Sequence, residues 1–327
     1  MKKVFLTLIL TILPLLASAE AVEIDGIWYN LVPNAKEAEV TWNPNILTWE
    51  GSYSGNIEIP ASVTYSEVKY NVTSIGSFAF NYCRGLSSVT IPNSVTSIGR
   101  SAFNSCSGLT SVTIPSSVTQ IDYGAFSGCI GLTSIKVENG NQYYDSRNNC
   151  NAIIETSSNT MIAGCKNTII PISVTSIGEN SFSGFKGLTT VTIPSSVTFI
   201  GQQAFFNCSG LSSIVSLNSN PPSVQYANVF YIVDENNCIV WVPKGSQSAY
   251  KEAYVWKDFA NIKEIADGDV NLDEKVNRKD INELVAHIMG NPSAGFNYAL
   301  ADVNKDGFIN VADIVTLLDL LSHKDSE

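Results

Sequence analysis

Side chains that carry oxygen recur at a fixed spacing near the end of the chain. The main-chain carbonyls of Lys275 and Phe308 fall at position 7 of two such series. Positions 1, 3, 5, 9 and 12 hold Asp269, Asn271, Asp273, Asn277 and Asp280 in the first series, and Asp302, Asn304, Asp306, Asn310 and Asp313 in the second. A hard cation with about six to eight oxygen ligands needs this spacing when one loop surrounds it. The sequence therefore predicts two bound Ca2+ ions, one in each loop.

The two loops differ at position 6, where a sharp turn favours glycine. Gly307 occupies this position in the second loop and Glu274 in the first. We expect Glu274 to weaken or strain the first site.

A helix is expected after each loop, opened by Asp280 and Asp313, whose carboxylates suit the positive end of a helix dipole. Apolar residues at helical spacing predict that these two helices pack face to face. The residues are Ile281, Leu284, Val285, Ile288 and Met289 in the first helix, and Ile314, Leu317, Leu318 and Leu321 in the second.

The start of the chain indicates export. Lys2 and Lys3 precede an apolar run from Val4 to Leu16, and Ala17-Ser18-Ala19 then provides small residues for cleavage. We predict a signal peptide over residues 1–19 and a secreted or cell-surface protein, and the sequence leaves retention in the periplasm open. The run is shorter than the ~20 apolar residues of a spanning helix, and no later segment predicts a membrane span.

A unit of 23 residues recurs almost letter for letter in the middle of the chain. Copies begin at Val72, Val95, Val118, Val174 and Val197. Four of them contain an L-x-x-V-x-I segment or a close copy, which starts at Leu86, Leu109, Leu132 or Leu188, and its alternation predicts a short strand. Pro92, Pro115 and Pro194 end three of these strands. A unit of this kind cannot bury its apolar face without a neighbour, so the period predicts a solenoid with a parallel sheet on one face.

These units resemble the BspA-type leucine-rich repeat of bacterial surface and secreted proteins, common in Bacteroidetes. The shared pattern is V-T-S-I-G-x-x-A-F-x-x-C-x-G-L-x-S-V-T-I-P-x-S. The resemblance implies a strand-dominated α/β leucine-rich repeat solenoid that presents a surface to a partner. We divide the array into an N-terminal cap (20–71), repeats (72–217) with a longer variant unit (136–173), and a C-terminal cap (218–265).

The outward positions of the predicted strands carry hydroxyl groups, with Lys136 as the exception. They are Ser87, Ser88, Thr90, Thr110, Ser111, Thr113, Thr189, Thr190 and Thr192. Stacked strands would turn them into hydroxyl ladders on the concave face. One interpretation is a surface for a polar ligand, glycan or host protein, and the other is that Ser and Thr suit exposed strands and solubility.

Aromatic residues gather at both ends of the array. They are Trp28, Tyr29, Trp42, Trp49 and Tyr53 at the start, and Trp241, Tyr250, Tyr254 and Trp256 at the end. We favour capping of the open solenoid ends over sugar stacking. Cys83, Cys106, Cys129 and Cys208 share the twelfth position of their units, where another unit has Phe185. A position that accepts Cys or Phe is an apolar one, so we expect mostly buried free thiols.

Composition and residue distribution argue against two classes of function. The net charge of −11 disfavours a nucleic-acid binder that depends on phosphate neutralisation. Both histidines, His287 and His323, lie beyond the repeats, so the array cannot assemble a Ser/His/Asp or Cys/His site. We predict no catalytic residues and no enzyme activity.

The region 266–327, with its two loops each followed by a helix and Asp at position 12, resembles a type I dockerin. That family clips secreted proteins to a cohesin, and loop positions 10 and 11 help to choose the partner. These positions hold Arg278 and Lys279 in one loop and Val311 and Ala312 in the other. The two pairs differ, which argues against binding in two orientations. The alternative is a calcium-stabilised terminal domain without a cohesin.

These observations predict a secreted, non-catalytic binding or adhesion protein. The solenoid would present a ligand surface, and the calcium-dependent module would attach the protein to a partner. The alternative is a substrate-targeting component of an extracellular polysaccharide-degrading assembly, docked through a cohesin.

Overall fold

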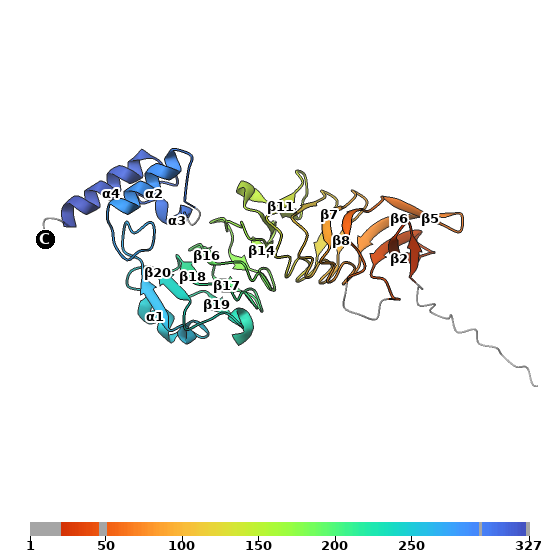
Figure 1. The fold of residues 1–327 in the computed structure, drawn as a ribbon, viewed down its shortest axis with the longest axis horizontal. Coiled ribbons are helices and arrows are strands. Elements are labelled where there is room, and N and C mark those ends of the chain that lie inside the picture. Colours follow the sequence, from red (N-terminus) through yellow and green to blue (C-terminus); the bar gives the residue numbers. More distant parts are fainter. Residues whose placement is uncertain (1–20, 46–50, 294–295, 325–327) are drawn as a thin grey trace, which may run out of the picture.

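The structure is a computed structural model that describes residues 21–45, 51–293 and 296–324. The predicted signal peptide and Trp49 lie outside the described residues. Figure 1 shows an elongated array of strands, with a small group of helices beside the end that is last in the sequence. The fold is therefore a strand-dominated solenoid followed by a small helical domain, as predicted.

The array begins with antiparallel hairpins. In the first sheet β2 pairs with β1 and β3, and β6 pairs with β5. A parallel contact from β3 to β6 then starts the repeated pattern. The strands are β1 (Val22–Ile24), β2 (Ile27–Val32), β3 (Glu37–Thr41), β4 (Gly55–Glu58), β5 (Ser62–Tyr65) and β6 (Val68–Ile75).

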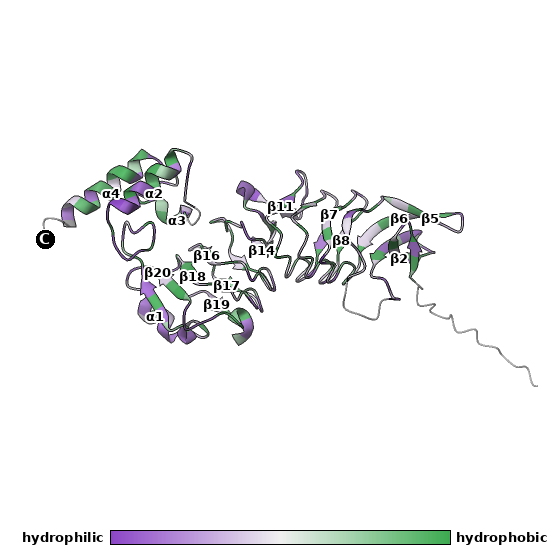
Figure 2. Ribbon diagram, in the orientation of Figure 1, coloured by the Kyte–Doolittle hydropathy of each residue, from purple (hydrophilic) through white to green (hydrophobic). Residues whose placement is uncertain are grey.

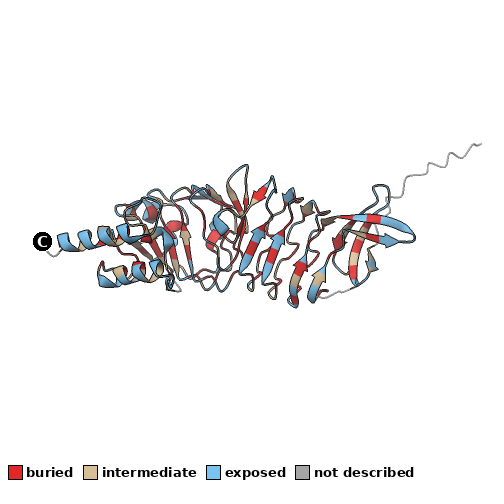
Figure 3. Cartoon of the chain, turned by 90° about the horizontal axis from the view of Figure 1, so that it is seen from above, coloured by how far each residue is buried: buried red, intermediate tan, exposed pale blue. Residues whose placement is uncertain are grey.

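Parallel strands at the predicted L-x-x-V-x-I segments form one face of the solenoid. Ser134 pairs with Ser111 and Ser213 with Thr190, an offset of one 23-residue unit. Hydrophobic and hydrophilic residues alternate along these strands (Figure 2), as do buried and exposed ones (Figure 3). The strands are β7 (Leu86–Thr90), β9 (Ser111–Ile114), β11 (Ser134–Val137), β16 (Thr190–Ile193), β18 (Ser213–Ser216), β20 (Ile239–Val242) and β21 (Asn261–Glu264).

Short strands form the second face, and the variant unit contributes a hairpin to it. In that unit β12 and β14 both pair antiparallel with β13, after which β14 resumes parallel pairing with β15. The strands are β8 (Ser97–Ile98), β10 (Gln120–Ile121), β12 (Tyr144–Asp145), β13 (Ala152–Glu155), β14 (Thr160–Gly164), β15 (Ser176–Ile177), β17 (Phe199–Ile200) and β19 (Ser223–Val224).

Two left-handed residues in each unit turn the chain between the faces. Position 7 of the five units has φ between 52° and 66°, for example 62° at Phe78 and 52° at Ser101. Position 11 is left-handed as well. It is Gly128 in the third unit and Gly184 in the fourth, and these two residues are in contact. A Cβ on Gly184 would lie 2.9 Å from the Gly128 Cα, so this close contact requires glycine.

Phenylalanine rings at position 9 stack along the core. The centroids of Phe80 and Phe103 are 5.0 Å apart, and those of Phe103 and Phe126 are 5.2 Å apart, with the rings nearly parallel. A second stack runs from Phe182 through Phe205. Because each ring covers the next, the stack buries apolar surface that an isolated unit would expose.

All seven cysteines are buried and free, which agrees with the expectation from their position. The thiols of Cys106, Cys129 and Cys208 each lie 3.0 Å from the position 9 carbonyl of the neighbouring unit, to which they donate. Burial raises the pKa of Cys83 and Cys208 to about 12. The column therefore lies in the apolar core of the array.

Buried aromatic residues close the end of the array, in the stretch that we assigned to a C-terminal cap. Tyr250 and Trp256 are buried, and the Trp256 Nε1 donates to the Pro222 carbonyl at 2.9 Å. The same stretch also adds β20 and β21 to the sheet. It contains η2 (Ala227–Phe230), α1 (Gln247–Glu252) and η3 (Trp256–Asp258), while η1 (Arg147–Asn149) belongs to the variant unit.

The helical domain consists of α2 (Arg278–Ile288), α3 (Tyr298–Ala301) and α4 (Val311–Lys324). The short helix α3, capped by Asn297, was not predicted. α2 and α4 pack against each other around a small core whose buried members are Val270, Val276, Leu284, Ala301 and Leu317.

Two predictions about these helices were wrong in detail. Both helices begin two residues before Asp280 and Asp313, because Asn277 and Asn310 accept main-chain N–H groups as caps. The predicted packing face is also too wide. Only a narrow stripe of each helix finds a partner in so small a domain, and the remaining members are exposed: Val285, Ile288, Met289 and Leu318.

Candidate functional site

The first loop wraps its main-chain N–H groups around its own carboxylates. Asp269 Oδ1 accepts from the Asp273 N–H at 3.2 Å, and its Oδ2 accepts from the Glu274 N–H at 3.0 Å. Asp280 Oδ1 accepts from Val270 at 2.9 Å, and its Oδ2 accepts from Asn277 at 2.9 Å. Positions 1 and 12 are thus tied to both halves of the loop.

The second loop repeats this pattern. Asp302 accepts from the Asp306 N–H at 3.0 Å and from the Gly307 N–H at 2.9 Å. Asp313 accepts from the N–H groups of Asn304 at 3.2 Å and Asn310 at 2.8 Å. The two loops therefore share one conformation, although they share few residue types beyond the predicted positions.

Both loops bury negative charge. Asp269 is 1% exposed and Asp280 is fully buried in the first loop, and Asp313 is fully buried in the second. Burial raises the pKa of Asp269 above its ordinary value, and the nearby charge of Asp280 raises it further. Buried carboxylates are costly unless a positive charge compensates them, so the donor set and its charge fit a cation.

The carboxylates do not form a preassembled cluster. Within the described residues, no group of three or more His, Cys, Asp or Glu side chains is placed to hold a metal. Asp273 Oδ1 instead accepts from the Lys275 N–H at 3.1 Å, while its Oδ2 lies 3.1 Å from the Lys279 Nζ. Asparagine and main-chain oxygens supply the remaining positions of each loop.

Position 6 is left-handed in both loops, with φ of 66° at Glu274 and 89° at Gly307. Glycine adopts this conformation freely, whereas glutamate is strained there. The Glu274 side chain forms an ion pair with Lys263, on the last strand of the array. The residue that departs from the loop pattern therefore also joins the loop to the solenoid.

The predicted partner-selecting positions are all on the surface. Arg278 and Lys279 are exposed at the start of α2, and Val311 and Ala312 are exposed at the start of α4. The two helix starts thus present a basic pair and an apolar pair.

The sequence did not predict the exposed apolar surface on α4, although Val311 and Leu318 belong to it. We call it the α4 strip, and it consists of Phe308 (70% exposed), Val311 (61%), Val315 (60%) and Leu318 (50%). The spacing of three to four residues places Val311, Val315 and Leu318 on one side of α4, and Phe308 precedes them in the second loop. Figures 2 and 3 show hydrophobic residues and extensive exposure along α4. The helical periodicity marks these residues as apolar, but it cannot tell whether they are covered.

The outward hydroxyl positions of the array strands are exposed or partly exposed, as expected, and Lys136 is exposed among them. At β11 this surface leads into a hollow of about 460 Å³ between the strand and the loop from Glu138 to Asn151. Asn148, Asn149 and Asn151 in this loop have φ between 52° and 58°.

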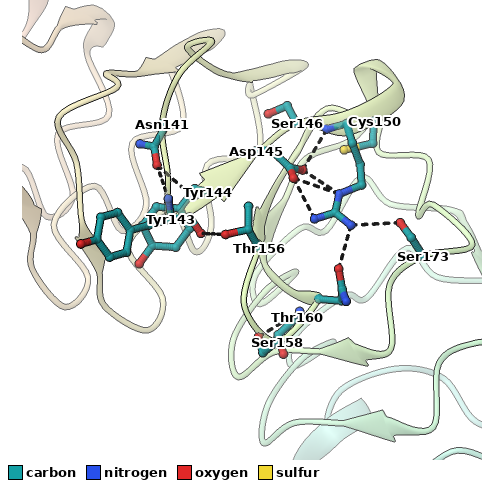
Figure 4. A network of polar contacts seen from close by, with 12 residues as sticks. Asn141, Tyr143, Tyr144, Asp145, Ser146, Cys150, Thr156, Ser158, Thr160 and Ser173 are labelled. Carbon is teal, nitrogen blue, oxygen red and sulfur yellow. Dashed lines mark hydrogen bonds and ion pairs between the residues drawn. The ribbon is translucent and has the colours of Figure 1, made fainter.

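A polar network holds the loop in place (Figure 4). Arg147 Nε lies 2.8 Å from Asp145 Oδ1, and Arg147 Nη1 lies 2.7 Å from Asn159 Oδ1. Ser146 Oγ accepts from the Val137 N–H at 3.0 Å and donates to the Ala152 carbonyl at 2.7 Å. The hollow therefore has a fixed shape.

The histidines lie in the helical domain. His287 stacks on Phe296 with ring centroids 4.6 Å apart, and His323 lies near the end of α4. Among the residues that the structure describes, no helix is long and apolar enough to cross a membrane.

Comparison with known families defines the class of the protein. Residues 58–162 and 153–263 match the BspA type Leucine rich repeat region, in six copies. The chain belongs to the BspA-type leucine-rich repeat family. Residues 267–322 match the Dockerin type I domain, so the helical domain is a dockerin. Dockerin type I domains bind calcium and a cohesin partner. Leucine-rich repeat and dockerin domains are themselves typically non-catalytic, and proteins that carry them are typically extracellular or on the cell surface.

Solved structures similar to this chain include bacterial leucine-rich repeat proteins. A leucine rich cell surface protein from Faecalibacterium prausnitzii is 18% identical, with 80% of this chain and 97% of that chain covered and a TM-score of 0.40. A leucine-rich repeat protein from Bacteroides capillosus is 26% identical, with 36% of this chain and 99% of that chain covered and a TM-score of 0.28. The T. pallidum leucine-rich repeat protein is 23% identical, with 60% of this chain and 71% of that chain covered and a TM-score of 0.34. No curated protein matches the chain.

Proposed function

We propose that this protein is a secreted, non-catalytic binding protein that its dockerin attaches to a cohesin-bearing partner when calcium is bound. The observation that carries the proposal is the α4 strip, an exposed apolar surface that begins in the second loop. A stripe of this kind on a two-helix domain marks a protein interface, since soluble surfaces rarely leave several large apolar side chains together.

Two Ca2+ ions are the cofactors of this proposal. The ion of the first loop would be held by Asp269, Asn271, Asp273, Lys275, Asn277 and Asp280, and that of the second by Asp302, Asn304, Asp306, Phe308, Asn310 and Asp313. Lys275 and Phe308 contribute main-chain carbonyls. Bound calcium supplies positive charge to the buried carboxylates, and the loops then hold the starts of α2 and α4 in place.

The difference between the two helix starts favours a single binding orientation. The α4 strip includes Val311, whereas the equivalent position on α2 is the charged Arg278. An apolar groove on a partner would accept the first surface and exclude the second, because burying an unpaired guanidinium is costly. Arg278 and Lys279 then serve at the rim of the interface.

The solenoid is proposed to present a polar ligand surface, for a glycan or a host protein. Support comes from the exposed hydroxyls of β7, β9 and β11 and the rigid hollow beside Lys136. At β16 the dockerin lies close to this face, since Asn297 Nδ2 donates to Thr192 Oγ1 at 3.3 Å. The ligand surface is therefore assigned to the first half of the array.

The second candidate function is substrate targeting within an extracellular polysaccharide-degrading assembly. The dockerin match favours it, because attachment to a scaffold through a cohesin is the known role of such domains. In that case the array would bring the assembly to its substrate.

Binding of the mature chain to a panel of purified cohesin domains, with calcium and again with chelator, tests the proposal. We expect at least one cohesin to bind only with calcium, and Leu318→Asp to abolish binding. The matched control is Val285→Asp, which adds the same charge at an exposed apolar position of α2. Binding that survives Leu318→Asp but not Val285→Asp would place the interface on α2 and contradict its assignment to α4. Absence of binding to every cohesin would contradict cohesin attachment.

Export is tested by N-terminal sequencing of the protein recovered outside the producing cell. A mature chain that starts at Glu20 is expected. Recovery of the uncleaved chain inside the cell would contradict secretion.

A further inference from the structure

A hollow of about 570 Å³ lies at the first end of the array, on the surface of the β2–β3 hairpin. Trp28 of β2 and Trp42, directly after β3, both line it. Trp42 is 49% exposed, although the other described tryptophans are buried or partly buried in the ends of the array. Capping therefore does not account for Trp42.

The main chain beneath the hollow is held rigidly. The hydroxyl of the buried Tyr53 accepts from the Trp28 N–H at 3.0 Å and donates to the Thr41 carbonyl at 2.6 Å. The Tyr53 ring packs on Phe80 with centroids 4.8 Å apart, which connects the hairpin to the phenylalanine stack. The two strands that carry the tryptophans are thus fixed relative to each other and to the core.

The polar groups at the hollow are neutral. Asn30 Nδ2 donates to Glu39 Oε1 at 3.0 Å, which sets the orientation of the amide. The Asn30 Oδ1 is then available as an acceptor, since it bonds no other described residue. Thr41 and Asn45 also line the hollow, and none of the described residues that line it is charged.

We propose that this hollow binds a neutral saccharide. A sugar ring combines an apolar face of C–H groups with hydroxyls around its edge, and it matches an exposed indole surrounded by amide and hydroxyl groups. The uncharged lining disfavours an ionic ligand, because it offers no counter-charge to offset desolvation. The hollow lies at the end of the array remote from the dockerin (Figure 1), so the inference goes beyond calcium-dependent attachment.

The test uses the mature chain, residues 20–327, and four probes: cellohexaose, xylohexaose, mannohexaose and laminarihexaose. Binding is measured by calorimetry and by the change in tryptophan fluorescence. At least one probe is expected to bind, and Trp42→Ala should weaken that binding by about tenfold or more, as truncation of an aromatic hot spot does. Asn30→Ala should weaken it to a smaller extent.

The matched control is Tyr254→Ala, which removes an aromatic residue of similar exposure (57%) at the opposite end of the array. It should leave saccharide binding unchanged, and so should a calcium chelator. Absence of binding to all four probes, or equal binding by Trp42→Ala and the wild type, would overturn the inference. Cohesin attachment is expected to depend on calcium, whereas saccharide binding is not. A failure of saccharide binding therefore leaves the test of cohesin attachment intact.

Discussion

Lys263, on the last strand of the array, forms an ion pair with Glu274, at position 6 of the first dockerin loop. The Lys263 ammonium also lies 5.6 Å from the centre of the Trp241 ring, which is buried in the array. Glu274 therefore accepts a left-handed backbone conformation in the loop while its side chain connects the dockerin to the solenoid. The loop pattern and the contact between domains place opposite demands on this residue.

Replacing Glu274 with glycine should strengthen calcium binding by the first loop and loosen the two domains. Glycine removes a left-handed strain of about 1–2 kcal/mol. The ion pair is partly exposed, with side-chain exposures of 36% and 59%. Its loss therefore costs only about 0–1 kcal/mol. Calorimetry would measure the calcium affinity, and small-angle scattering would measure the spread of domain positions.

Lys263→Ala is the control for that experiment, because it breaks the ion pair without changing the loop backbone. It should broaden the scattering profile and leave the calcium affinity of the first loop near that of the wild type. A gain in affinity in Lys263→Ala equal to that in Glu274→Gly would refute the strain explanation.

Calcium removal should unfold the dockerin and leave the array folded. The dockerin core is small, and its buried carboxylates lose their compensating charge when the ion leaves. Among the described residues of the array, no Asp or Glu is buried. Circular dichroism with chelator should therefore lose helical signal alone. Asp302→Ala should reproduce part of this loss with calcium present, and Asp319→Ala, an exposed aspartate of α4, should not.

The phenylalanine stack should be a major source of array stability. Phe103 is fully buried between Phe80 and Phe126. Its replacement by alanine leaves a cavity and should lower the free energy of unfolding by about 3–5 kcal/mol. Phe78→Ala, at a position that is 45% exposed in a neighbouring unit, should have a much smaller effect. Urea denaturation measures the free energy of unfolding of both variants. A similar loss in both would contradict a special contribution from the buried stack.

Array stability should fall at alkaline pH because of the thiol column. Burial raises the pKa of Cys83 and Cys208 from 9.0 to about 12. Their stabilising contribution is present below the pKa of the unfolded thiols and is lost as pH rises toward that of the folded ones. Urea denaturation should show this decline above pH 9.0, with a smaller slope in the double variant Cys83→Ala, Cys208→Ala. An identical slope in the variant would show that the thiols do not titrate in this way.

The sequence predicts most of the array and the positions of the dockerin loops, because both are governed by local spacing. The 23-residue period places Val89 and its equivalents on strands, and the alternation of positions decides which side chains are buried. The Lys263–Glu274 pair and the Asn297–Thr192 contact could not be predicted in this way. They join residues from different domains, whose relative placement no repeat encodes.

The sequence pattern also could not predict which apolar residues of the helices are buried and which are exposed. Leu317 and Leu318 are neighbours of similar hydrophobicity, yet Leu317 is fully buried and Leu318 is 50% exposed. Helical periodicity identifies an apolar side of α4, but the width of the buried stripe depends on how many helices pack against it. The same limit applies to Trp42, which stands among capping aromatics in the sequence and lines a hollow in the structure.

Calorimetric titration of Ca2+ into the chelated, full mature chain tests the central claim most directly. The assignment of the twelve ligands predicts two bound ions for the wild type. It also predicts one for Asp302→Ala, with the first site retained. A wild-type chain that binds no calcium, or an Asp302→Ala chain that still binds two ions with unchanged affinity, would contradict the account of how this domain is held together and presented to its partner.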